Sequence, residues 1–299
     1  MTKAPLNNIL RSDLEKKWGV EVSTFIRKLE SLGFSICLVG GAVRDYLASG
    51  KISDDLDFEL RHAKLEGSKD FLELVKGVTK DYNGKEIGLS ILLFHFEGFS
   101  LELSPPRKES YLSYSPPYGH KDFDVIFDFQ CAEEVSFVRR DFTLNALGLK
   151  FGEEELTLVD PFNGFENLNQ KLLVPCGKDF SKDPVRFLRT LRFSMEKNLK
   201  FDQSILKSFD LSKLTAHYFF KEGFKVGIVG FSKQFFYYVD RLDIAVAEQL
   251  ESLRFFVDLE FESYEKNHFL KEMRKDSSIK EDDLFKIAQL LGVGKKVFS

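Results

Sequence analysis

The fold is decided by Phe34-Ser-Ile-Cys-Leu-Val39, which breaks at Gly40-Gly41 into Ala42-Val-Arg-Asp-Tyr-Leu-Ala48, and by Leu56-Asp-Phe-Glu-Leu60. The first run is short and apolar, as in a buried strand, and the run after the two glycines is typical of a helix. The last run alternates apolar and acidic residues, which predicts a half-buried strand. These elements predict an α/β fold for this part of the chain.

Working outward, the same patterns predict further elements on both sides. We expect helices at residues 23–32, 68–80 and 131–146, and strands at 89–96, 99–103, 147–150 and 156–159. Four prolines and several serines predict a loop at Ser104–Gly119. Beyond Asp179 the pattern is helical. The sequence therefore predicts an α/β head at 1–175 followed by a helical remainder at 176–299.

Composition limits the class of protein. The 299 residues are 43% apolar, enough for a sizeable core, and 32 phenylalanines favour aromatic packing between helices. Cys37, Cys131 and Cys176 lie far apart without metal-ligand spacing, which indicates reduced thiols of a cytoplasmic protein. We expect no signal peptide at residues 1–19 and no membrane-spanning run. A net charge of −4 argues against non-specific coating of nucleic acid.

Two acids stand in the second predicted strand. Asp55 and Asp57 flank Leu56, and alternate side chains of a strand point the same way, so both carboxylates share one face. Carboxylates about 6–7 Å apart along a strand can hold Mg²⁺ bridged to the phosphates of a nucleotide. Such a pair taken alone is more often a solvated strand face.

The preceding glycine turn strengthens the functional interpretation. In Leu38-Val-Gly-Gly-Ala-Val-Arg-Asp45 the glycines let backbone N–H groups approach phosphate oxygens at a helix N-terminus, and Arg44 could pair with a phosphate. An ordinary strand–helix turn and a surface Arg44–Asp45 pair would explain each feature separately. A glycine turn, an arginine and the acids within eighteen residues together indicate a site for a nucleoside triphosphate.

Four segments, in order, resemble the motifs of the class II CCA-adding enzyme and bacterial poly(A) polymerase family. The first is Val39-Gly-Gly-Ala-Val-Arg-Asp45 with Asp55-Leu-Asp57, and the second is Arg139-Arg-Asp-Phe-Thr-Leu-Asn-Ala146. The third is Leu158-Val-Asp-Pro-Phe-Asn-Gly164, and the last is Asp183-Pro-Val-Arg-Phe-Leu-Arg-Thr-Leu-Arg-Phe193. The resemblance covers about 155 residues and implies a template-independent nucleotidyltransferase. It also implies a nucleotidyltransferase head with a small mixed sheet and flanking helices at 1–175, followed by an all-helical neck and shortened body at 176–299.

The resemblance also implies roles for individual residues. Asp55 and Asp57 would be catalytic and hold Mg²⁺, and Glu102, on another predicted strand, is a tentative third metal ligand or a solvent-facing glutamate. The nucleotide would be bound by residues of all but the third motif, namely Gly40, Gly41, Arg44, Arg140, Asp141, Asn145, Asp183, Arg186, Arg189 and Arg192.

The last motif combines the resemblance with helix geometry. Asp183, Arg186, Arg189 and Arg192 recur every three residues, which forms one stripe on a helix, and the arginines repel one another unless they face an anion. In the family the matching Asp and first Arg hydrogen-bond the base, so protein replaces a template. Family members usually carry Glu immediately before this Asp; here it is Lys182, a charge reversal that could alter the choice between cytosine and adenine.

The expected activity is addition of nucleotides to the 3′ end of an RNA, with tRNA CCA addition or repair from CTP and ATP preferred. After Phe193 only about a hundred residues remain, fewer than in typical members, which leaves tRNA selection and termination open. Poly(A) addition is the close runner-up, although the arginine-rich segment that marks bacterial poly(A) polymerases is not found. Two more functions stay open: modification of a protein or small molecule, and RNA binding by an inactive remnant.

Overall fold

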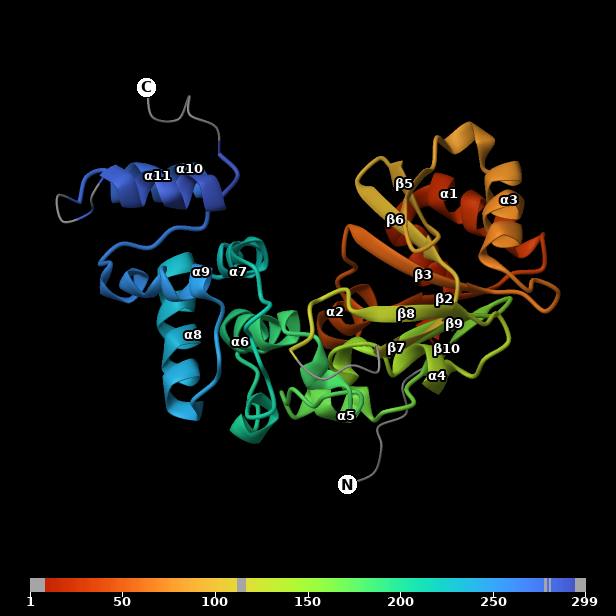
Figure 1. The fold of residues 1–299 in the computed structure, drawn as a ribbon. Coiled ribbons are helices and arrows are strands. Elements are labelled where there is room, and N and C mark those ends of the chain that lie inside the picture. Colours follow the sequence, from red (N-terminus) through yellow and green to blue (C-terminus); the bar gives the residue numbers. More distant parts are fainter. Residues whose placement is uncertain (1–8, 112–116, 277–278, 280, 294–299) are drawn as a thin grey trace. The chain divides into compact units, whose positions relative to one another are not determined.

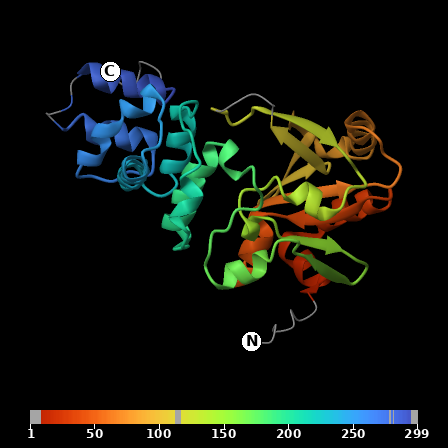
Figure 2. The same cartoon turned by 60° about the horizontal axis from the view of Figure 1, so that its bottom comes forward.

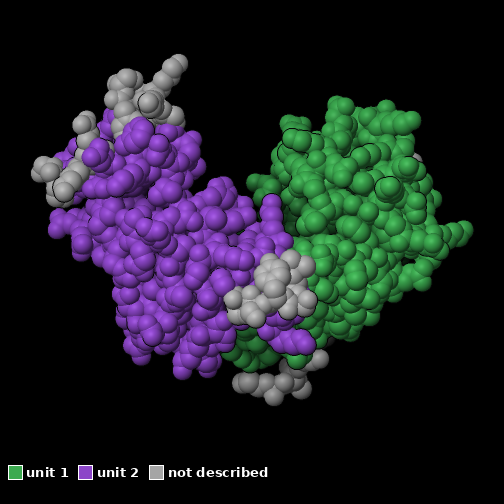
Figure 3. All heavy atoms as spheres, viewed as in Figure 1, with its two compact units in different colours: residues 1–110, 123–177 green, residues 111–122, 178–299 purple. Residues whose placement is uncertain are grey.

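The structure, a computed structural model, describes residues 9–111, 117–276, 279 and 281–293. It divides into two compact units, which are coloured separately in Figure 3. Unit 1, the head, comprises residues 1–110 and 123–177, and unit 2, the helical unit, comprises residues 111–122 and 178–299. Residue 111 and residues 117–122 thus group with the helical unit, although they fall within the 1–175 segment that the sequence assigns to the head.

The head is built on an eight-stranded mixed sheet, shown in Figure 1. The order is β1-β10-β9-β2-β3-β6-β5-β4, and only the β3–β6 pairing is parallel. The strands are β1 (Ile9–Leu10), β2 (Ser35–Val39), β3 (Asp55–Arg61), β4 (Lys85–Gly88), β5 (Ile91–Phe96), β6 (Phe99–Ser104), β9 (Gly148–Phe151) and β10 (Glu155–Val159). A separate two-stranded sheet pairs β7 (Arg107–Tyr111) with β8 (Phe123–Phe127).

Helices of the head pack on this sheet through a shared apolar core. They are α1 (Arg11–Glu30), α2 (Gly41–Ser49), α3 (Ser68–Val78), η1 (Lys80–Tyr82), α4 (Glu133–Phe137), η2 (Thr143–Asn145) and α5 (Gly164–Asn169). Trp18 and Phe25 of α1 and Phe71 of α3 join Leu38 of β2 and Phe58 of β3 in one buried cluster. Both β2 and β3 contribute to this cluster and pair directly with each other. The C-terminal end of β2 and the N-terminal end of β3, which carry the predicted site, are therefore held in register.

Apart from Tyr111, the last residue of β7, the described part of the helical unit contains only helices and one isolated bridge, Leu211 to Val246 (Figures 1 and 2). Its helices are η3 (Phe180–Lys182), α6 (Val185–Lys197), η4 (Gln203–Leu206), α7 (Ala216–Gly223), α8 (Ile228–Leu242), α9 (Glu248–Glu251), η5 (Arg254–Asp258), α10 (Lys266–Met273) and α11 (Glu281–Leu290). Phe187, Phe219 and Phe235, from three helices, meet edge to face. This confirms the aromatic packing that the phenylalanine content predicts.

The predicted fold class is confirmed, with errors in particular segments. The predicted helix at 131–146 is wrong, because α4 ends at Phe137 and only a short 3₁₀ turn follows at residues 143–145. The predicted loop at 104–119 contains β7, and its residues 112–116 lie outside the described residues. Strands β1, β4 and β8 were not predicted. None of the described helices combines the length and apolarity needed to cross a membrane.

Candidate active site

The glycine turn lies at the junction of β2 and α2. Gly40 has a φ of +83°, a backbone conformation that favours glycine, and its N–H donates to the Leu147 carbonyl at 3.0 Å. The N–H of Arg44 donates to the Gly40 carbonyl at 3.1 Å, which begins the helix. The turn is therefore held by backbone bonds on both sides, and α2 begins where β2 ends.

The acids lie on the neighbouring strand β3. Asp55 is exposed, Leu56 is buried and Asp57 is half-buried, which is the alternation that the sequence predicts. In the parallel pairing of β3 with β6, Asp57 is directly opposite Glu102, and on the other side it is opposite Val39, the residue before the glycine turn. The strand register thus brings Glu102 beside the acids.

These carboxyl groups affect one another. Burial raises the pKa of Asp57, Arg140 opposes that change, and the nearby charge of Asp55 adds to it. Burial likewise raises the pKa of Glu102, with further contributions from the charges of Asp57 and Asp55. A divalent cation would relieve this repulsion and favour the ionised carboxylates. The acids therefore fit a site for a hard cation such as Mg²⁺.

The number of acids suits magnesium held jointly with substrate. Within the described part of the chain, no group of three or more His, Cys, Asp and Glu side chains is arranged to hold a metal ion. Mg²⁺ characteristically binds one or two carboxylates together with substrate phosphates, so Asp55 and Asp57 suffice for that mode. The role of Glu102 as a third ligand stays a prediction.

Arg140 supplies a cation between the glycine turn and the acids. A Cβ atom on Gly40 would lie 2.8 Å from Nη1 of Arg140 and 3.5 Å from Oδ2 of Asp57. The Nε of Arg140 is buried and has no hydrogen-bond partner among the described residues, while its guanidinium lies 5.6 Å from the Phe137 ring. A buried donor without a partner is costly, so this arginine is suited to an anionic ligand.

Replacing Gly40 with Ala should impair both folding and turnover. The positive φ costs about 1–3 kcal/mol for a residue with a side chain, and the methyl group would displace Arg140. We expect a lower midpoint of urea unfolding and a reduced rate of nucleotide incorporation. The control is Gly50→Ala, which has a φ of +69° but nothing within 4 Å of the added methyl. Equal losses of incorporation in both variants would contradict a specific role for the space at Gly40.

The predicted residues of the second motif form a buried network with the first. Arg44 donates two bonds to the Asp45 carboxylate, at 2.9 and 2.7 Å, and Nη1 donates to Asn145 Oδ1 at 2.5 Å. The amide of Asn145 donates in turn to Asp141 Oδ1 at 2.9 Å. The predicted helix at 131–146 would place Asp141 and Asn145 on one face, but they meet across a turn instead. Gly41 lies against Arg44, since a Cβ there would be 3.6 Å from its guanidinium.

A third acid on β3 has a different environment. Glu59 follows Asp57 on the same strand face, but it is only 1% exposed. Its Oε1 accepts hydrogen bonds from Arg61 at 2.7 Å and from the Ser136 hydroxyl at 2.9 Å. Glu59 is therefore paired inside the head. The acidic alternation at residues 56–60 signalled its position, but sequence reasoning gave it no role.

The third motif has a structural role in the head. Asp160 accepts hydrogen bonds from the amides of Gly164 and Phe165, at 2.6 and 3.1 Å, and so caps α5. A Cβ on Gly164 would overlap the carbonyl oxygen of Thr143 in η2. Glycine at this position therefore lets α5 approach the turn that carries Asn145.

In the helical unit, the last motif begins directly after η3 and forms the first turns of α6. Asp183 and Arg186 are both buried, and Arg186 Nε lies 3.7 Å from Asp183 Oδ2. The guanidinium of Arg186 also lies 5.8 Å from the Phe180 ring. Arg186, Arg189 and Arg192 lie on α6 as the sequence predicts, whereas Asp183 precedes the helix in an extended conformation and is not part of the helical stripe.

A buried acid that the sequence analysis did not identify offsets part of the repulsion between the arginines of α6. Glu222 of α7 is buried and lies 2.5 Å from Arg192 Nε; burial alone would raise its pKa, but nearby cations, Arg192 foremost, lower it overall. Arg192 also pairs with Glu196 and lies 4.0 Å from the Phe193 ring. A signal existed, because Glu222 falls three residues after Phe219, on the apolar side of α7. Nucleotide binding by Arg189 and Arg192 stays a prediction.

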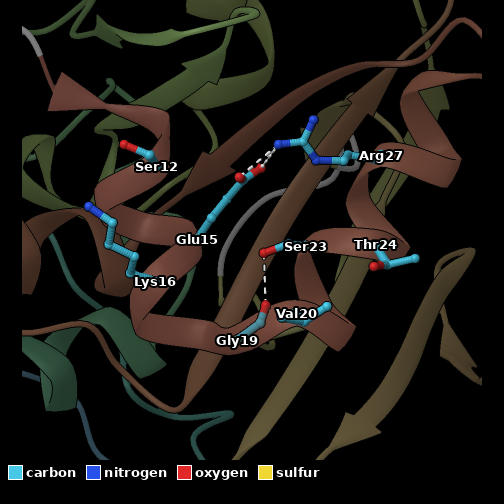
Figure 4. Close-up of a pocket in the computed structure, with 8 residues that line it drawn as sticks. All are labelled: Ser12, Glu15, Lys16, Gly19, Val20, Ser23, Thr24 and Arg27. Carbon is cyan, nitrogen blue, oxygen red and sulfur yellow. Dashed lines mark hydrogen bonds and ion pairs between the residues drawn. The ribbon is translucent and has the colours of Figure 1, made fainter.

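A separate shallow pocket lies on the head at the kink of α1, where Gly19 has a φ of +84°. Figure 4 shows the pair formed by Glu15 and Arg27 on its wall, at 2.8 Å. The lining residues are Ser12, Glu15, Lys16, Gly19, Val20, Ser23, Thr24 and Arg27. None of them belongs to the predicted site.

The chain is similar to known proteins in sequence. The family model of the poly A polymerase head domain matches residues 36–174. A CCA-adding enzyme of Pediococcus pentosaceus is 30% identical over 192 residues, which cover 62% of this chain and 43% of the relative. A CCA-adding enzyme of Bacillus licheniformis is 33% identical over 183 residues, covering 60% and 41%. The chain thus spans less than half the length of these relatives.

A solved structure extends the likeness in fold beyond the head. The CCA-adding enzyme of Bacillus stearothermophilus, crystallised with CTP, aligns with a TM-score of 0.63 over 93% of this chain and 66% of that one, at 19% identity. Residues 36–174 are therefore similar to poly A polymerase head domains, and this part of the chain is similar to the corresponding part of CCA-adding enzymes.

Proposed function

We propose that the chain is a template-independent nucleotidyltransferase that adds nucleotides to an RNA 3′ end, with tRNA CCA addition or repair as its preferred activity. The observation that carries this proposal is the acidic edge formed by Asp55, Asp57 and Glu102 beside the Gly40 turn and Arg140. The relatives are named CCA-adding enzymes, one structure of similar fold holds CTP and another holds a primer tRNA and an ATP analog, which supports CTP and ATP as substrates and tRNA as the acceptor. The head and helical unit would act as catalytic and base-reading parts.

The proposed reaction is attack of the RNA 3′-hydroxyl oxygen on the α-phosphorus of the nucleotide. A new P–O bond forms, the bond to the β-phosphate oxygen breaks, pyrophosphate leaves and the hydroxyl proton is released. Asp55 and Asp57 would hold Mg²⁺, which supplies charge neutralisation on the phosphates and a lowered pKa for the attacking hydroxyl. Arg140 and the amides of the glycine turn would hold the triphosphate in place.

Asp183 and Arg186 would select the base. A carboxylate accepts hydrogen bonds and a guanidinium donates them. Cytosine and adenine both present an amino donor beside a ring-nitrogen acceptor, whereas uracil and guanine present a carbonyl oxygen where the amino group would be. An Asp–Arg pair therefore accepts the first two bases and disfavours the others. Lys182, which stands where family members usually carry Glu, forms an ion pair with Asp179 at 2.8 Å, so its positive charge is paired with Asp179.

The test uses tRNA transcripts that end before CCA, after C and after CC, each incubated with Mg²⁺ and labelled CTP or ATP. We expect two cytidylates and then one adenylate to be added, followed by a stop, and chelation of the metal to abolish incorporation. Label incorporated without a metal would contradict the magnesium assignment. Absence of incorporation with any RNA would overturn the proposal.

Poly(A) addition is the second candidate, because the head family is named for poly A polymerases. The same assay separates the two activities. Long adenylate tails on unrelated RNA would favour this candidate over CCA addition. Labelled protein in place of labelled RNA would favour an enzyme that modifies protein.

A further inference from the structure

Within the helical unit, the segment just before β8 contacts Asp183, the predicted base-reading residue directly before α6. The Nδ1 of His120 lies 2.9 Å from Oδ1 of Asp183, and its ring packs edge to face on Tyr218 of α7 at 4.7 Å. Two residues further, Asp122 forms an ion pair with Lys213 at 3.4 Å. His120 is thus held on one side by an aromatic ring and meets Asp183 on the other.

The contact distinguishes the two oxygens of the Asp183 carboxylate. Oδ1 lies 3.0 Å from the Val185 N–H, which donates to it, and it also faces His120 Nδ1. Oδ2 is the oxygen that faces Arg186, at 3.7 Å. Two partners on Oδ1 fix the rotation of the carboxylate and orient Oδ2 beside the guanidinium. His120 must carry a proton on Nδ1 to donate in this arrangement.

The adjacent cation is engaged elsewhere and does not perform this task. Lys182 forms an ion pair with Asp179, and its ammonium lies 5.5 Å from the ring of Tyr111 and 5.8 Å from that of Tyr118. A family-type glutamate at 182 could not make either interaction, because both require a positive charge. The side-chain donor on Asp183 Oδ1 therefore comes from His120.

We propose that His120 is a positioning residue that sets base specificity by holding Asp183. With Oδ1 occupied, Oδ2 is oriented to accept from the exocyclic amino group of cytosine or adenine. A carboxylate that rotates freely spends less time in that orientation and opposes a carbonyl-bearing base less strongly. This inference rests on the proposed function of Asp183 and Arg186 as the base-reading pair.

The test compares three variants in steady-state kinetics with CTP, ATP and UTP on an RNA primer. In H120A we expect KM for CTP and ATP to rise about tenfold with little change in kcat, and the preference for CTP over UTP to fall about tenfold. H120N should recover both values, because the Asn amide nitrogen can take the place of Nδ1 as donor. H120F keeps a ring on Tyr218 but has no donor, so it should behave as H120A.

The matched control is H217A, which removes an exposed histidine of α7 whose ring also packs on Tyr218, at 5.2 Å. It should leave KM and selectivity unchanged. Wild-type selectivity in H120F, or no recovery in H120N, would show that ring packing and not the hydrogen bond matters, and would overturn the inference.

Calorimetric titration with CTP separates failure of this inference from failure of the proposed function. Wild type that binds CTP without transferring it would refute the transferase proposal, while weaker CTP binding by H120A than by H120N would still support the role of His120. Equal CTP affinity in wild type and H120A would refute that role. Absence of CTP binding by wild type would refute both proposals.

Discussion

Replacing Asp57 with Asn is expected to reduce nucleotide incorporation by at least about 10²–10³-fold, the loss typical of removing one electrostatic stabiliser of a transition state. The same change should leave the melting temperature equal or higher. Burial and the charge of Asp55 disfavour the ionised carboxylate in the metal-free protein, and Asn removes that charge without changing the size of the side chain. Loss of activity without loss of stability distinguishes a ligand from a structural residue.

The pH dependence of stability follows from the same raised pKa. Because the pKa of Asp57 in the folded protein lies above its ordinary value of 3.8, the folded state retains a proton that the unfolded chain releases. Stability contributed by this group is therefore present at low pH and is lost as the pH rises from about 3.8 through the raised folded value. D57N should lack this component in melting curves recorded across that range.

A suitable control for Asp57 is Asp54→Asn, which removes an exposed carboxylate three residues earlier. This variant should incorporate labelled CTP at the wild-type rate. Mg²⁺ should raise the melting temperature of wild type and D54N more than that of D57N, because a ligand stabilises the state that binds it. Near-normal incorporation by D57N would show that the acids on β3 do not hold the catalytic metal.

Local pattern was sufficient to predict the part of the fold around the acids. The apolar run before Gly40, the turn and the alternation around Leu56 each depend on neighbouring residues, and the structure has β2, α2 and β3 there. The predicted helix at 131–146 failed for a local reason as well. Asp141 Oδ1 accepts from the Phe142 N–H, and Phe142 takes an extended conformation that forms a bridge to Pro175.

Contacts between distant residues could not be predicted from periodicity. The position of Glu102 opposite Asp57 depends on a parallel strand pairing, and nothing near Glu102 in the sequence specifies its partner strand. The same holds for His120 and Asp183, whose contact depends on a loop being held by the helical unit. Periodicity describes which face of an element is buried, whereas register and loop placement arise only from tertiary packing.

Replacing Glu59 with Ala is expected to destabilise the head by about 3–5 kcal/mol, the cost of breaking a buried ion pair. Arg61, 11% exposed, would then lose its carboxylate partner at 2.7 Å. Although burial alone would lower the pKa of Arg61, the charge of Glu59 contributes to raising it, so the guanidinium depends on this acid. The single tryptophan, Trp18, lies in the head core, so its fluorescence during urea unfolding reports on the head.

The control is Glu86→Ala on β4, which breaks the exposed pair with Lys76 at 2.9 Å and should cost no more than about 1 kcal/mol. Glu59→Gln separates structural support from metal binding, because Gln keeps an oxygen that can accept from Arg61 and Ser136 but carries no charge for a cation. We expect E59Q to be less stable than wild type yet to retain nucleotide incorporation, unlike D57N. If E59Q loses incorporation while remaining folded, the metal site extends to Glu59. The assignment of Asp55 and Asp57 as metal ligands and of Glu59 as a purely structural ion-pair partner is then wrong.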